Sequence, residues 1–319
     1  MLEETTPRYS PAGRLYVPYR THLRILSDRQ NTSSVVASRV PTAQKSYEKI
    51  GLGNFGRNPF ARRRRELMMP KNSHFYRPAS DPTEVDGATL NNELLLDLPD
   101  KERRAIYSQL VFLPMRTHDV LNESGAPIRY AYFMNSGLAS VLNVMEDGKS
   151  VEVGLTGKEG FVGLPLVVGF ASSPSRVIIQ IEGSAYRISA SALVELLRKC
   201  PTLEKRLLRY SQVLATQASH VAACNRLHEV DERLARWLLM SQDRIGSDEV
   251  SLTQEFLAHM LGTRRSSVTV AASILQTAGL IKYRRGQVNI VDRQGLEAAA
   301  CECYRALVQQ SSRWRDESN

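Results

Sequence analysis

One stretch near the C-terminal end, residues 251–291, constrains the fold more than any other. Apolar residues recur there at helical spacing, Gly262 interrupts the pattern, and a second apolar stripe follows. Ser251 or Thr253 can cap the first helix, and Gly279 ends the second. Two helices joined by a short glycine-containing turn are typical of a helix-turn-helix.

The end of this stretch, LIKYRRGQVNIV, predicts two short strands around a turn at Arg285-Gly286. A helix-turn-helix followed by such a hairpin is a winged helix. Residues 251–291 hold five Lys+Arg against one Glu, which favours an anionic partner. The alternative is a winged helix that contacts other proteins, with the arginines as solvated surface.

The second helix of the stretch carries the residues expected to contact DNA, because the N-terminal end of a recognition helix enters the major groove. Arginine bridges guanine O6 and N7, and short hydroxyls reach base edges or phosphates. We expect three residues to read bases: Arg265, Ser266 and Thr269. We expect four residues to contact phosphates: Arg264, Ser267, Lys282 and Arg284.

The overall charge is weaker evidence for DNA binding than this local balance. The 319 residues carry a formal net charge of +9, but residues 1–90 hold 15 of the 42 Lys+Arg and 8 of the 33 Asp+Glu. Residues 1–88 are rich in Pro, Arg and Ser, and we expect them to form a disordered basic tail. The block ARRRREL at 61–67 is then a solvated linker or a nucleic-acid arm.

Residues 89–200 predict a strand-rich domain. Short segments of alternating polar and apolar residues are separated by turn signals such as Asp147-Gly148, which is typical of an antiparallel barrel or sandwich. A long helix follows from Pro201 to about His228, and residues 230–319 hold the winged helix. The chain is thus predicted to be α+β, with a strand domain, a long helix and a C-terminal DNA-binding domain.

The long helix, residues 201–229, predicts dimerisation. Apolar residues alternate on it at spacings of three and four, as in a coiled-coil seam. The expected dimer seam is Leu207, Tyr210, Leu214, Gln217 and Val221. The alternative is that this stripe packs on the strand domain of its own chain.

The order of these parts resembles the CRP/FNR superfamily of bacterial transcription regulators over about residues 92–310. The segments that carry the resemblance are YFMNSGLASV, VEVGLTGKEGFVGLPLVVG, ERLARWLLM and LTQEFLAHMLGTRRSSVTVAASILQTAGLI. The resemblance implies a cyclic-nucleotide-binding-type antiparallel β-roll, a dimerisation helix and a winged helix. It also implies a homodimer on double-stranded DNA, contact with RNA polymerase and a small-molecule effector in the roll.

Two departures from the family pattern concern the ligand and the operator. In nucleotide-binding members a Glu follows the roll glycine and holds the ribose, but here Leu164 follows Gly163. Arg176 is the candidate for the arginine that holds the cyclic phosphate, but its spacing differs. The weak effector pocket is therefore Gly163 and Arg176, and we expect no dependence on cyclic AMP. In the reading helix Ser266 replaces the family's glutamate, so the operator is expected to differ.

Several cysteines and histidines are candidate metal ligands. His220, Cys224 and His228 are spaced by four on the long helix and offer an alternative metal- or haem-dependent sensor. Cys301 and Cys303 are expected on different sides of one terminal helix, which makes a shared metal awkward, and no cysteine precedes Cys200 to hold an iron–sulfur cluster. The sequence-based expectation is no metal and no cofactor.

Other classes are excluded by what the sequence lacks. No HExxH or GxSxG motif occurs, so we do not expect an enzyme. No signal peptide or membrane-length apolar run is visible, so we expect a cytoplasmic protein that does not enter the membrane. The expected function is a sequence-specific transcription regulator that reads a pseudo-palindromic site.

Overall fold

The computed structural model describes residues 83–96 and 98–316. The predicted basic tail, up to residue 82, and its block at 61–67 lie outside the described residues. The last part of that predicted tail forms a small antiparallel hairpin of β1, Glu84–Val85, and β2, Ala88–Thr89. The Tyr186 hydroxyl donates to Ala88 O at 2.8 Å and so ties this hairpin to the strand domain.

The strand domain is an antiparallel sheet with the order β3-β8-β5-β6, which β4 and β7 extend. After the short helix α1, Asp100–Tyr107, its strands are β3 Val111–Met115, β4 Val120–Asn122, β5 Tyr130–Val144, β6 Ser150–Thr156, β7 Phe161–Val162 and β8 Arg176–Ser189. The long strands β5 and β8 pair along most of their length, with register shifts between Met134 and Ala139 that bend the sheet. Phe133 and Phe161 pack in its core with ring centroids 4.7 Å apart.

Helices cover the end of this sheet and lead to the long helix. They are α2 Leu164–Val167, α3 Ala190–Leu197 and α4 Pro201–Leu227. Pro201 suits the first turn of α4, where no amide hydrogen is needed. The buried carboxylate of Glu102 on α1 accepts from the free amides of Thr202 and Leu203 at 3.1 and 3.0 Å. This carboxylate fixes the start of α4 against the strand domain.

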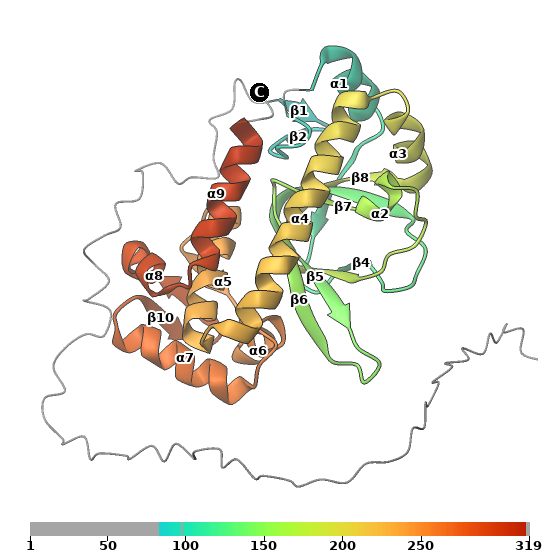
Figure 1. Cartoon of the computed structure of the whole chain (residues 1–319). Coiled ribbons are helices and arrows are strands. Elements are labelled where there is room, and N and C mark those ends of the chain that lie inside the picture. Colours follow the sequence, from blue (N-terminus) through green and yellow to red (C-terminus); the bar gives the residue numbers. More distant parts are fainter. Residues whose placement is uncertain (1–82, 97, 317–319) are drawn as a thin grey trace, which may run out of the picture. The chain divides into compact units, whose positions relative to one another are not determined.

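The stripe predicted to form the dimer seam lies on the inner face of α4. Leu207, Tyr210, Gln217 and Val221 are buried within the chain, and Leu214 is half-buried. The Tyr210 hydroxyl donates to Thr156 Oγ1 on β6 at 3.0 Å, next to Gly160, where a Cβ would overlap it. The structure therefore places this stripe in the interior of the protomer, as the alternative interpretation had it, with α4 packed along the strand domain (Figure 1). Residues on the opposite face of α4 are exposed as far as the described part of the chain goes.

The C-terminal domain is a winged helix. Its elements are α5 Val230–Ile245, β9 Glu249–Ser251, α6 Gln254–Met260, α7 Arg265–Thr277, β10 Ile281–Arg284, β11 Gln287–Ile290, α8 Arg293–Ala299 and α9 Cys303–Asp316. The predicted helix-turn-helix and hairpin are confirmed. The short strand β9 was not predicted. It completes a three-stranded sheet of order β10-β11-β9.

Buried polar contacts join the strand domain to α5. The indole of Trp237 donates to Glu152 Oε1 at 2.9 Å, and the guanidinium of Arg244 lies 2.7 Å from Glu159 Oε1. Both carboxylates come from the strand domain, on β6 and just after it.

No helix in the described part of the chain is long and apolar enough to cross a membrane.

Candidate nucleic-acid interface

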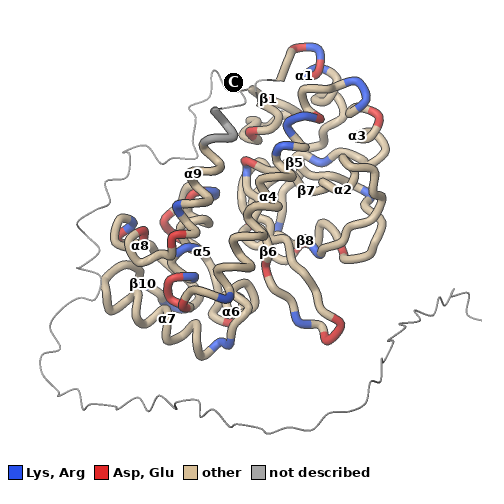
Figure 2. Tube along the Cα trace, in the orientation of Figure 1, with Lys and Arg blue, Asp and Glu red and all other residues tan. Residues whose placement is uncertain are grey.

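The start of α7 is shaped by a tight turn after α6. Gly262 takes a positive φ of 57°, and the Thr263 amide donates back to Ala258 O at 2.9 Å. Arg264 is the extended residue before the helix, and Arg265 is its first residue. The turn therefore sets both arginines at the N-terminal end of α7, where α6 meets α7 and basic positions lie together (Figure 2).

The predicted base-reading residues are all exposed. Arg265, Ser266 and Thr269 lie on the open side of α7, while Val268 between them is buried in the core of the domain. The Thr269 hydroxyl donates to Gln254 Oε1 at 2.8 Å. Gln254, the first residue of α6, thus lies beside the predicted reading residues. Sequence reasoning missed it because it belongs to the other helix.

Two apolar side chains also stand on the open side of α7. Val270 is 60% exposed and Ile274 is 40% exposed. Such residues on a recognition helix can pack on the C5-methyl group of thymine in the major groove. Sequence reasoning did not assign them, although an apolar pair outside the buried stripe of an amphipathic helix was the available signal.

The wing presents the predicted phosphate contacts. Lys282 and Arg284 are exposed on β10, two residues apart and so on one face of the strand. Arg285 and Gly286 both take positive φ, 49° and 80°, which gives the tight hairpin turn. The Tyr283 hydroxyl donates to Leu252 O at 2.8 Å and fastens the wing to the start of α6. Of the other two predicted phosphate contacts, Arg264 is exposed and Ser267 half-buried.

The predicted effector residues do not form a phosphate cradle between them. Gly163 precedes α2, next to Val162, which pairs with Tyr132 near the start of β5. Arg176 pairs with Leu142 near the other end of β5, and its guanidinium lies 3.4 Å from the Glu123 carboxylate. Leu164, at the position of the family glutamate, begins α2 with an apolar side chain.

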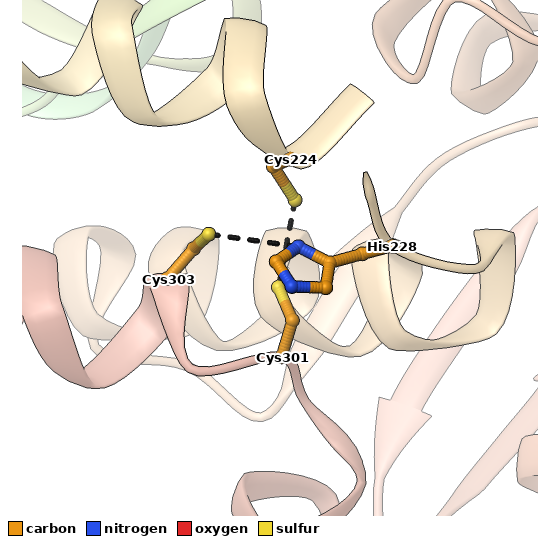
Figure 3. A group of neighbouring side chains, drawn as sticks. All are labelled: Cys224, His228, Cys301 and Cys303. Atoms are coloured by element: carbon orange, nitrogen blue, oxygen red, sulfur yellow. Dashed lines mark hydrogen bonds between the residues drawn. The ribbon is translucent and has the colours of Figure 1, made fainter. Parts of the chain in front are cut away.

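The structure brings together cysteines and a histidine that sequence reasoning considered as two separate sets. Cys224, His228, Cys301 and Cys303 place one potential ligand atom each within 4.8 Å of one another (Figure 3). His220 is not part of this group. The expectation that Cys301 and Cys303 share one helix is wrong, because α8 ends at Ala299 and α9 begins only at Cys303. Cys301 therefore lies in the linker and can turn toward the same point as Cys303.

The electrostatics of this group favour a thiolate at Cys224. A hydrogen bond from the Cys301 thiol lowers the pKa of Cys224 to about 4, with a further contribution from the positive charge of Arg236 and against the opposing effect of burial. The same hydrogen bond raises the pKa of Cys301, because that thiol is the donor. The hydrogen bond to Cys224 also raises the pKa of His228.

Comparison with protein families finds both domains. The Crp-like helix-turn-helix domain matches residues 232–299, and the cyclic nucleotide-binding domain matches residues 113–200. The chain has the CRP/FNR fold. The antiparallel sheet is its β-roll, α4 its long helix, and α5 to β11 its winged helix-turn-helix.

Solved structures show the same fold at low sequence identity. FixK2 from Bradyrhizobium japonicum matches with a TM-score of 0.53 and 18% identity, over 60% of this chain and 98% of that one. A Crp/Fnr-family protein from Eubacterium rectale matches with 0.52 and 17%, over 66% and 98%. CLP, a c-di-GMP-responsive global regulator from Xanthomonas campestris, matches with 0.52 and 17%, over 60% and 99%. The search of curated proteins gave no match.

Proposed function

We propose that this chain is a homodimeric transcription regulator that reads a pseudo-palindromic DNA site through α7. The observation that carries the proposal is the exposed N-terminal end of α7, where Arg265 and Ser266 stand free of the buried face. The wing adds Lys282 and Arg284 for the phosphates beside the groove. By family resemblance, the partners are double-stranded DNA, a second copy of the chain and RNA polymerase.

The dimer face that the structure favours is the outer side of α4. Exposed residues recur along it at alternating spacings of four and three, namely Leu208, Gln212, Ala215, Ser219, Ala222 and Arg226. Leu208 is 43% exposed, and the small residues after it allow two helices to approach closely. Regulators of this family act as dimers, and a dimer holds two reading helices one DNA turn apart.

The dimer face is tested by charge. Ala215→Arg places a bulky cation at the centre of the outer stripe and leaves the buried stripe untouched. We expect monomers in analytical ultracentrifugation and loss of operator binding, while Lys205→Arg, at another exposed position of α4, stays dimeric. A dimeric Ala215→Arg protein would show that the copies meet elsewhere.

The roll is proposed to work without cyclic AMP. Leu164 offers no acceptor for a ribose hydroxyl, and Arg176 already has Glu123 as a partner. CLP, which has the same fold, responds to c-di-GMP, so a small molecule other than cyclic AMP is a candidate effector. Two carboxylates of the roll, Glu152 and Glu159, contact α5 instead. Effector binding would then change the domain contacts by favouring one of two arrangements.

The test of the proposed function is selection of bound duplexes from a random pool by the full chain. We expect a palindromic motif, with binding that weakens steeply as salt rises because phosphates release counterions. The Arg265→Ala variant is selected in parallel, and its motif should lack the base preference at one position of each half-site. Failure to enrich any motif, with and without added small molecules, would favour a winged helix that contacts proteins instead.

A further inference from the structure

A cluster of four potential metal ligands lies outside the DNA interface and the roll. Cys224 and His228 come from the C-terminal end of α4, and Cys301 and Cys303 come from the linker before α9 and its first residue. Figure 3 shows the four side chains converging on one point from these two segments. The segments are more than seventy residues apart in sequence, and all three cysteines are buried.

Two distances between ligand atoms in this cluster match a single tetrahedral ion, and all four ligand atoms lie within 4.8 Å of one another. With Zn–S bonds of 2.3 Å and a Zn–N bond of 2.0–2.1 Å, tetrahedral ligand atoms lie about 3.8 Å apart for two sulfurs and about 3.5 Å for sulfur and nitrogen. Cys224 Sγ lies 3.5 Å from Cys301 Sγ, and Cys303 Sγ lies 3.7 Å from His228 Nδ1. A multi-iron cluster would hold its ligands further apart, because inorganic atoms lie between them.

The second nitrogen of the histidine has the partner that a metal-bound imidazole needs. His228 Nε2 lies 3.1 Å from the carboxylate of Glu302, the residue between the two cysteines. When Nδ1 binds a metal, Nε2–H donates to this carboxylate, and the carboxylate fixes the ring and strengthens the ligand. His228 follows the last residue of α4 with an extended backbone, which turns its ring away from the helix axis.

Two buried arginines supply charge balance. Arg233 and Arg236 on α5 are buried, and the Nε of each finds no hydrogen-bond partner among the described residues. A zinc ion with three thiolates and a neutral imidazole carries a single net negative charge. Buried cations of this kind are stabilised by a nearby anionic centre, and both arginines lie on the first two turns of α5, which begins two residues after His228.

We propose that Cys224, His228, Cys301 and Cys303 bind one structural Zn²⁺ ion in each protomer. On binding, the cysteine thiols give up their protons to solvent, and the thiolates and His228 Nδ1 complete a closed four-coordinate shell. The ion joins the α4–α5 junction to the α8–α9 linker. It therefore fixes the winged helix to the end of the long helix, independently of any DNA contact.

The test begins with the metal content of the full chain, which is purified without chelator and analysed by inductively coupled plasma mass spectrometry. We expect about one zinc per protomer, as in other four-ligand structural sites. Cys303→Ser and Cys224→Ser should lose at least nine-tenths of it. Cys200→Ser is the matched control, because Cys200 is buried in a different core cluster and should keep the full amount.

A second measurement uses chiefly the wild-type protein. The wild-type protein is stripped with chelator and titrated with Co²⁺, whose thiolate charge-transfer and tetrahedral d–d bands report the ligand set. We expect saturation at about one equivalent, displacement by Zn²⁺, and a shifted spectrum with His228→Cys, which keeps four ligands. We also expect amide exchange to slow several-fold on metal binding in residues 224–229 and 300–303.

The outcomes separate this proposal from the proposed function. Absence of zinc together with failure to bind Co²⁺ would overturn the site, as would zinc kept in Cys224→Ser and Cys303→Ser, or iron with visible absorption in the purified protein. Since neither readout uses DNA, a zinc-containing chain that fails to select any duplex would sink only the regulatory role.

Discussion

In the winged helix the charged residues assigned to function are exposed, whereas two carboxylates of the β-roll, Glu152 and Glu159, are turned toward α5. Arg264, Arg265 and Lys282 project from the surface. Glu152 of the roll is buried, and Glu159 is bonded to the buried Arg244 of α5. Both domains have the CRP/FNR fold, but these arginines and the lysine of the winged helix are exposed, whereas these two carboxylates of the roll face α5.

This difference indicates different roles for the two domains. Exposed cations cost little to maintain and are free to meet phosphates, whereas buried ions must be paired to be tolerated. The roll therefore uses its carboxylates to hold α5, the first helix of the DNA-binding domain. Because these carboxylates contact α5, we infer that the roll mainly supports the winged helix.

The largest expected effect comes from breaking that support. Arg244→Ala leaves the Glu159 carboxylate without its buried partner at 2.7 Å. We expect the free energy of unfolding to fall by about 3–5 kcal/mol, as for other buried pairs that lose one member. Urea denaturation followed by Trp fluorescence measures it, because Trp237 lies seven residues, or about two helical turns, before Arg244 on α5.

Two variants sharpen this test. Lys199→Ala removes the exposed ion pair with Glu195 and should change stability only slightly. The double variant Arg244→Met with Glu159→Gln removes both charges and should recover most of the loss, because no buried charge is left unpaired. A loss as small as that of Lys199→Ala would mean that the roll does not support α5.

The second prediction concerns Glu152. Its burial raises its pKa to about 7 from 4.5, against the lowering effect of hydrogen bonds from Ser140 and Trp237 and of the charges of Arg236 and Arg244. Below pH 4.5 both the folded and the unfolded chain hold this proton. Between pH 4.5 and 7 only the folded chain does, so stability falls as pH rises, by about 3 kcal/mol in total.

The measurement compares the wild type with Glu152→Gln over pH 4.5 to 8. The variant has no proton to lose at this position, so its unfolding free energy should not show this fall, and subtraction removes the contribution of the other titrating groups. A difference between the two proteins that stays constant with pH would show that Glu152 is ionised throughout, with its charge balanced by the arginines of α5.

The third prediction tests the exposed side of the comparison. Arg265→Ala should weaken binding to the selected operator by about 1–3 kcal/mol and relax preference at one base position in each half-site. Fluorescence anisotropy with the operator and with single-base variants measures both. Stability should be unchanged, because the side chain is exposed. An operator affinity equal to that of the wild type would show that Arg265 does not read a base.

Local patterns explain what the sequence could predict. The α6–Gly262–α7 unit and the β10–β11 hairpin are contiguous, and each is specified by its own apolar period and turn residues. The period of α4 was equally clear. Periodicity identifies a buried face but does not say what buries it. Leu207 and Val221 were therefore predicted to pack against a second copy of the chain, whereas in the structure they are buried within their own protomer.

Contacts between distant segments could not be predicted in this way. The Glu152–Trp237 and Glu159–Arg244 contacts join the roll to α5 across 85 residues. The Cys–His cluster depends on one backbone detail, the break between Ala299 and Cys303. Helical spacing applied through that break directs the two cysteines apart, and only the folded linker turns them toward Cys224.

The fourth prediction separates positioning contacts from reading contacts. Lys282→Ala on the wing should weaken binding to all duplexes alike and reduce the slope of log affinity against log salt by about 1. The measurement is the same anisotropy titration at several salt concentrations, with operator and random duplex. Glu249→Gln on β9, outside the predicted contacts, serves as the control. Weakening confined to the operator would place Lys282 among the base-reading residues.

The smallest expected effect is that of cyclic AMP. A ligand at a free concentration of about one hundred times its dissociation constant raises the free energy of unfolding by about 2.7 kcal/mol. A change of this size is readily seen in thermal unfolding. We expect no shift with millimolar cyclic AMP, because Leu164 cannot accept from the ribose and Arg176 is paired with Glu123. A saturable rise in unfolding temperature would show that the roll binds the nucleotide through other groups. The roll would then bind an effector as well as support α5. Both domains would have a ligand, and they would differ only in which ligand each one binds.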